Sequence, residues 1–269
     1  MTTEAVSERI NTTAPKEYTL DVRGIPTHVF ESGPETAPVL LYLHGTSLGN
    51  LWLEYHQRLA SSFRVIAPDI PGFGKTERPD LMRDMDDYVL YFRDMLDALG
   101  LEKVNLAGHS LGGWMAAEVA VWYPERVNKL VLSNAAGIRV KGTPIANLFA
   151  LNPQETLDVC FDDVMAAMPL MPVEMNIDYF LVQYRERQTL ASLAWNPGFD
   201  RKLERRLARL TCPTLIIWGV NDRLIPPVYG DVFHRKIVGS KLVLLQGTGH
   251  MPMFEKAQEW ADAINEFLV

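Results

Sequence analysis

Short apolar runs alternate with stretches of helical periodicity along most of this chain. The runs cover residues 39–43, 64–68, 104–107, 127–133, 214–218 and 241–246. Strands buried on both faces of a parallel sheet have this appearance, because helices cover both faces. Apolar residues recur at helical spacing over 85–99, where Gly100 suits a C-cap, and again over 257–268. The alternation predicts a mostly parallel α/β sheet flanked by helices, with right-handed crossovers.

The N-terminal part differs from this pattern. Residues 1–16 are polar and aperiodic, which predicts a flexible arm. Two strand-like stretches follow at 18–22 and 27–30, and they are joined around Gly24 and Pro26, which predicts a hairpin. We expect one sheet domain from residues 17–137 and 210–269.

A long segment without a good strand separates the runs at 127–133 and 214–218. It contains several prolines and three helical stretches, at 154–167, 175–194 and 200–210. Connections of this length are unusual in a compact domain and are often functional. We therefore predict a helical cap at 138–209, folded over the carboxyl edge of the sheet. Its methionines predict an adaptable apolar wall: Met165, Met168, Met171 and Met175.

Composition excludes several classes of protein. The net charge of -7, without a basic block, argues against nucleic-acid partners. Two cysteines, Cys160 and Cys212, are too few for a disulfide framework or a cysteine zinc site, so we expect reduced thiols. The apolar runs are too short to span a bilayer, and the first residues do not resemble a secretory signal. The sequence predicts a cytoplasmic protein with no membrane partner.

A Gly-x-Ser-x-Gly motif occupies residues 108–112, between an apolar run and an apolar helix. This context is typical of a nucleophile elbow. The turn is so sharp that Ser110 must adopt a strained backbone, and side chains at 108 and 112 would collide with neighbouring backbone. Ser110 is therefore the candidate nucleophile, presented at a helix N-terminus.

A serine needs a base, and the base needs an orienting carboxylate. His250 lies in a glycine-rich loop after the last run, and Asp222 follows the run before it. The order Ser110, Asp222, His250 is that of α/β-hydrolases. Asp69 is a rival carboxylate, but its loop looks like a structural turn in which Asp69 bonds its own backbone. The other histidines are expected in structural positions (His44), packed in or near the site (His109), or at the surface (His28, His56, His234).

An oxyanion hole requires two fixed N–H donors. One is expected from Leu111, directly after the nucleophile. The other is expected from Thr46, in the loop after the run at 39–43, where Gly45 lets the backbone approach. This mechanism needs neither a metal ion nor an organic cofactor.

The chain resembles the α/β-hydrolase superfamily over residues 18–269. The motifs that carry the likeness are His-Gly-Thr at 44–46, the loop at 69–74, the elbow at 108–113, Gly-Val-Asn-Asp at 219–222 and Gly-His at 249–250. The resemblance implies an α/β-hydrolase fold with an inserted helical cap, and it points to the capped branch. Ser110 argues against the epoxide hydrolases and haloalkane dehalogenases of that branch, whose nucleophile is Asp.

Three functions remain open. The first is hydrolysis of carboxylic esters of small, fairly apolar substrates. The second is cleavage of a carbon–carbon bond in meta-cleavage products of aromatic degradation. Such enzymes usually carry Trp soon after the histidine, where this chain has Met251-Pro-Met253, and they use a cap arginine, for which Arg185 and Arg187 are candidates, although both also suit a solvated helix.

The third function is ligand binding without catalysis. For each of the three we expect a small-molecule partner, and a homodimer is one arrangement that the sequence allows. The expected substrate contacts are Ser47, His109, Trp114, Met168, Arg185 and Met251.

Overall fold

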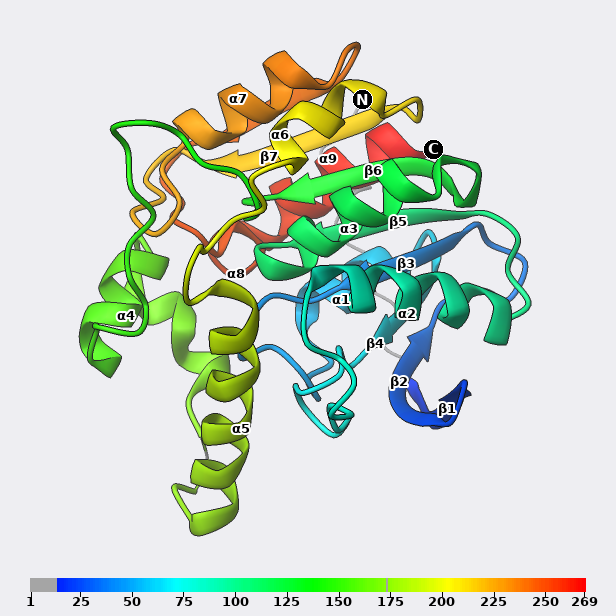
Figure 1. The fold of residues 1–269 in the computed structure, drawn as a ribbon, viewed down its shortest axis with the longest axis horizontal. Coiled ribbons are helices and arrows are strands. Elements are labelled where there is room, and N and C mark those ends of the chain that lie inside the picture. Colours follow the sequence, from blue (N-terminus) through cyan, green and yellow to red (C-terminus); the bar gives the residue numbers. More distant parts are fainter. Residues whose placement is uncertain (1–13, 173) are drawn as a thin grey trace, which may run out of the picture.

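The computed structural model describes residues 14–172 and 174–269, and its described strands form one eight-stranded sheet (Figure 1). The strand order is β1-β2-β4-β3-β5-β6-β7-β8. Strands β3 to β8 are parallel, and β1 and β2 add an antiparallel hairpin beside β4. The bounds are β1 Lys16–Val22, β2 Ile25–Ser32, β3 Val39–Leu43, β4 Arg64–Pro68, β5 Val104–His109, β6 Val127–Ser133, β7 Thr214–Gly219 and β8 Lys241–Leu245.

The predicted mostly parallel α/β sheet is thereby confirmed. The strands follow the apolar runs closely because the central strands are buried on both faces: every residue of β5 and β7 is buried. The predicted arm at 1–16 lies mostly outside the described residues, and Lys16 already belongs to β1.

Helices cover both faces of the sheet (Figure 1). α1 and α9 pack against each other on one face, while α2 and α3 pack against each other on the opposite face. α2 begins where Asp84 accepts hydrogen bonds from the N–H groups of Asp86 and Asp87, and Gly100 follows its end with a φ of 66°. The helix bounds are α1 Glu54–Leu59, α2 Met85–Ala98, α3 Leu111–Trp122, α7 Val228–Lys236, α8 Pro252–Glu255 and α9 Ala257–Leu268, with a 3-10 turn at Pro124–Arg126.

The segment between β6 and β7 contains several helices. Its first two α-helices lie beyond the carboxyl ends of the parallel strands, and its last α-helix lies beside α7 (Figure 1). The helix predicted at 154–167 is divided into two shorter helices, which are separated at residues 161–163. The elements are α4 Pro153–Cys160, α5 Ile177–Ala194 and α6 Leu203–Arg206, with 3-10 helices at Val164–Leu170 and Leu207–Arg209. Residues 138–209 are called the inserted segment below.

Neither cysteine of the chain forms a disulfide: Cys160 is buried and Cys212 is half-buried. Over residues 14–172 and 174–269, every helix is too short or too polar to cross a membrane.

Candidate active site

Three loops at the carboxyl edge of the sheet bring Ser110, Asp222 and His250 together. Ser110 follows β5, Asp222 follows β7, and His250 follows β8. The Oγ of Ser110 lies 2.9 Å from Nε2 of His250, and Nδ1 of His250 lies 2.8 Å from Oδ2 of Asp222. A base within hydrogen-bond reach of the hydroxyl, itself oriented by a carboxylate, is the geometry of an activated nucleophile.

The turn that carries Ser110 is strained as the motif predicts. Ser110 has φ 53° and ψ -114°, outside the usual regions for a residue with a side chain. A Cβ at Gly108 would collide with the carbonyl of Gly112, and a Cβ at Gly112 would collide with the carbonyl of Leu43. The N–H of Ser110 donates to the carbonyl oxygen of Ser133 at 3.0 Å, which fixes the turn to β6. Only glycine fits at positions 108 and 112, two residues before and two residues after the serine.

The carboxylate of Asp222 is fully engaged. Its Oδ2 faces both His250 and the side-chain amide of Asn134, each at 2.8 Å. Its Oδ1 accepts the N–H groups of Leu224 and Ile225 at 2.9 and 2.8 Å. Because these donors fix its position, Asp222 can hold the Nδ1 proton of His250 in one orientation. The sequence reasoning missed Asn134, although a polar residue directly after β6 at this edge was a usable signal.

The inserted segment holds the loop that carries His250. The N–H of His250 donates to the carbonyl oxygen of Cys160 at 2.7 Å. The carboxylate of Glu255 accepts the N–H of Gly249 at 2.7 Å and the N–H groups of Asp162 and Asp163 at 2.7 and 2.8 Å. Burial, above all, raises the pKa of Glu255 from its ordinary value. The sequence reasoning missed Glu255, whose charge gives no sign of this role.

Two further histidines are buried near the hydrogen-bonded line of Ser110, His250 and Asp222. His44 donates from Nδ1 to the carbonyl oxygen of Gly45 at 2.7 Å, and its Nε2 accepts the N–H of Ile70 at 3.0 Å. It therefore holds the loop that carries Thr46. His109 is wholly buried with its ring centroid 5.0 Å from that of His250, and burial lowers its pKa well below the ordinary value. His109 is thus a neutral packing partner of His250.

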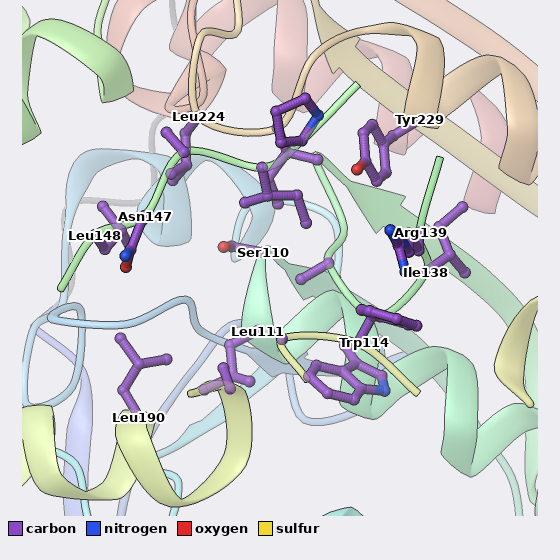
Figure 2. A pocket seen from close by; sticks show the side chains of 18 of the residues that line it. Ser110, Leu111, Trp114, Ile138, Arg139, Asn147, Leu148, Leu190, Leu224 and Tyr229 are labelled. Carbon is purple, nitrogen blue, oxygen red and sulfur yellow. The ribbon is translucent and has the colours of Figure 1, made fainter. Parts of the chain in front are cut away.

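Ser110 opens into a cavity of about 530 Å³ (Figure 2). Thr46 and Leu111, the two residues expected to supply oxyanion-hole N–H groups, line it together with Ser110. Leu111 is the first residue of α3, so its N–H is one that helical hydrogen bonds leave unused. Most of the remaining wall is apolar: Trp114, Ala136, Ile138, Val140, Pro144, Ile145, Ala146, Leu148, Phe149, Leu190, Ala194, Trp195, Phe199, Leu224 and Ile225.

Comparison with known proteins shows which family the chain belongs to. The family model for the alpha/beta hydrolase family matches residues 40–263. The chain belongs to the alpha/beta hydrolase family. A 2-hydroxymuconate semialdehyde hydrolase of Pseudomonas sp. strain CF600 is 28% identical, with 91% of each chain covered.

Two solved structures are similar over most of their length. A serine hydrolase involved in carbazole degradation has 26% identity and a TM-score of 0.76, and the match covers 95% of this chain and 99% of that one. A membrane phospholipase A has 27% identity and a TM-score of 0.73, with coverage of 95% and 86%.

Of the six substrate contacts expected in this hydrolase, Trp114 lines the cavity and the other five do not. Ser47 turns outward, with a φ of 61°, and Met251 is buried at the start of α8. Arg185 donates to the carbonyl oxygen of Gly74, so its guanidinium docks α5 on a core loop. His109 is fully buried and is not among the residues that line the cavity.

The prediction of a methionine wall is also wrong. Met168 is 61% exposed and lies outside the cavity, as do the other three methionines of the group. Leu190, Ala194 and Trp195, at the C-terminal end of α5, form that part of the wall instead. Helical spacing could not show which end of α5 faces the hydrolase core.

Two histidines expected at the surface are buried. His28 bonds Asp69 and Glu17 through its two ring nitrogens, each at 2.8 Å. Its partner Asp69 accepts the N–H groups of Lys75 and Asn50, so Asp69 fastens its own loop, as expected, and a second loop as well. His56 is 1% exposed and stacks on Trp52.

No metal centre is evident in the part of the hydrolase that the structure describes. There, no group of three or more histidine, cysteine, aspartate or glutamate side chains is arranged to hold a metal ion.

Proposed function

We propose that this alpha/beta hydrolase cleaves carboxylic esters of small, fairly apolar substrates through an acyl-enzyme. The observation that carries the proposal is the hydrogen-bonded line from Ser110 through His250 to Asp222, with its hydroxyl end opening into a largely apolar cavity. An apolar wall of this kind suits a substrate whose ester carbonyl is flanked by apolar groups.

Each residue of the line has a distinct role. Ser110 Oγ attacks the ester carbonyl carbon while Nε2 of His250 takes the hydroxyl proton. The carbonyl oxygen becomes an oxyanion, which the N–H groups of Leu111 and Thr46 stabilise. His250 then gives the proton to the departing alkoxide oxygen as the carbon–oxygen bond breaks. Water attacks the acyl-enzyme with the same base, which releases the acid and restores Ser110.

Asp222 supports both half-reactions. A positive imidazolium forms at His250 in each, and the adjacent carboxylate stabilises it. Because Asp222 is 3% exposed and fully hydrogen-bonded, it needs no reorganisation when that charge appears.

Cleavage of a carbon–carbon bond is the second candidate. The similarity to a 2-hydroxymuconate semialdehyde hydrolase over 91% of the chain favours it. The cap arginines proposed for that reaction do not support it, because neither lines the cavity: Arg185 is bound to Gly74, and Arg187 donates to the carbonyl oxygens of Leu148 and Phe149. We therefore place ester hydrolysis first.

The test is a substrate panel of 4-nitrophenyl esters, a lactone and a dienoate ring-fission product. We expect ester turnover in the wild type and its loss in Ser110→Ala. Ser62→Ala, which changes a serine remote from the site, should behave as wild type. Ester hydrolysis that persists in Ser110→Ala would reject the mechanism, and turnover of the dienoate alone would favour the second candidate.

A further inference from the structure

One charged side chain, Arg139, lines the cavity among the residues that the structure describes. The rest of the wall is apolar or neutral, with polar groups at Thr46, Ser110, Asn147 and Tyr229. Arg139 follows β6 by six residues and is exposed to solvent, so it lies where the cavity meets water. A lone positive charge beside an apolar chamber is a strong selector among small ligands.

The guanidinium of Arg139 has no acidic partner within 14–172 and 174–269. The ion pairs found there engage other arginines, and no hydrogen bond involves its side chain. Its guanidinium carbon lies 5.6 Å from the ring centroid of Phe199, which also lines the cavity. This stacking holds the planar group against the wall and leaves its N–H donors available.

The neighbouring hydroxyl is already used. Tyr229 donates to the carbonyl oxygen of Thr143 at 2.7 Å, so it does not compete for an acceptor that reaches Arg139. In Figure 2, Arg139 and Tyr229 lie on one side of the cavity and Ser110 lies apart from Arg139. A ligand that contacts both Ser110 and Arg139 must therefore span the chamber.

We propose that Arg139 binds a carboxylate carried by the substrate at the end remote from the reacting carbonyl. Resting on the ester-hydrolase function proposed above, this narrows the substrate class to half-esters of dicarboxylic acids, with an apolar chain between the two ends. The chain lies along the apolar wall, the ester carbonyl lies at Ser110, and the free carboxylate pairs with the planar guanidinium.

Matched substrates separate charge from size. Mono-4-nitrophenyl glutarate and 4-nitrophenyl pentanoate have acyl chains of the same length, and only the first carries a terminal carboxylate. We expect the wild type to prefer the glutarate ester. Arg139→Gln should lower kcat/KM for it by about tenfold to a hundredfold, mainly through KM, which is the usual effect of losing a charged hydrogen-bond partner. Turnover of the pentanoate should change less than about twofold.

Two further variants control the experiment. Arg139→Lys keeps the charge and should retain part of the preference, because it loses only the planar two-donor geometry. Arg201→Gln removes another arginine of the inserted segment, which is exposed and lies outside the cavity lining, and it should leave the preference unchanged. Salt should weaken the preference for the glutarate ester in the wild type, because the pair is exposed.

Equal turnover of the two esters by the wild type, or equal losses for both in Arg139→Gln, overturns the proposal while ester hydrolysis stands. If neither ester is hydrolysed, the proposed function fails, and a binding experiment then tests the role of Arg139.

In this experiment, glutarate is added to the Ser110→Ala variant. It should quench the fluorescence of the cavity tryptophans Trp114 and Trp195. Arg139→Gln in that background should abolish the quenching, and unchanged quenching rejects the subsite.

Discussion

The carboxylate of Glu255 accepts the N–H of Gly249 at 2.7 Å, one residue before His250. The same carboxylate holds two N–H groups of the inserted segment, so one side chain joins that segment to the loop of the proposed base. We expect Glu255→Ala to lower stability by about 1–3 kcal/mol, because it leaves amide groups unpaired. It should also reduce kcat, because His250 loses its fixed position.

Denaturant unfolding and steady-state kinetics measure the two effects of Glu255→Ala. Glu255→Gln, which keeps an acceptor oxygen, should recover part of both. Glu259→Ala removes a glutamate that pairs with Lys256 near the surface, and it should be close to neutral. A Glu255→Ala enzyme with wild-type kcat would show that the loop keeps His250 in position without Glu255.

The second prediction concerns the support of Asp222. Asp222→Asn should lower kcat by about 10³–10⁴-fold while the fold persists, because the amide no longer stabilises the imidazolium of His250. Asn134→Gly removes the amide that donates to Asp222 and suits the φ of 46° at that position. We expect an intermediate loss of kcat there, with KM little changed. Equal activities of Asn134→Gly and wild type would remove Asn134 from the machinery.

The third prediction concerns the glycines of the elbow. Gly112→Ala places a Cβ against the backbone of Leu43, which cannot retreat without disturbing β3. We expect a loss of several kcal/mol in stability, or no folded protein at all. Gly142→Ala is the matched control, because nothing lies within 4 Å of its Cβ and only its φ of 84° is unfavourable. That change should cost about 1–2 kcal/mol in thermal or urea unfolding.

The fourth prediction concerns His56. Burial, with a smaller contribution from His44, lowers its pKa from 6.5 to about 3. Between these values the unfolded chain binds a proton that the folded chain does not, so the stabilising contribution is complete above pH 6.5 and declines as the pH falls. At pH 5 the loss is about 2 kcal/mol, at 1.36 kcal/mol per pH unit.

Urea unfolding at pH 7.5 and pH 5 tests the assignment of His56. His56→Gln should show a smaller drop in stability between the two pH values than wild type. His234→Gln alters an exposed histidine and should keep the wild-type drop. A wild-type drop in His56→Gln would mean that another group carries the proton linkage.

The sequence was sufficient to predict the strands and the candidate catalytic residues, because there the local pattern and the geometry of the fold lead to the same result. Buried parallel strands appear as apolar runs, and the loops after them must meet at one edge of the sheet. Ser110, Asp222 and His250 could therefore be placed together from the sequence alone. The turn chemistry at Gly108 and Gly112 follows from backbone sterics alone.

The parts that sequence reasoning missed depend on packing between distant segments. Arg185 and Arg187 sit on one helix, and only the docking of α5 decides that neither reaches the cavity. Arg139 carries no local signal that separates it from a solvated loop residue. His28 and His56 looked like surface groups, because their burial is produced by partners far along the chain. Similarly, the role of Glu255 depends on three backbone N–H donors that only the folded chain brings to its carboxylate.

Ser110 and His250 stand 140 positions apart in the sequence, and the loop of His250 is bonded to Cys160 from a third region. Contacts this distant form late, after local helices and neighbouring strands have ordered. Recovery of ester turnover after dilution from denaturant should therefore lag behind recovery of the far-ultraviolet circular dichroism signal. The recovery of enzymatic activity would then report the last stage of folding, in which the loop after β8 reaches the elbow after β5.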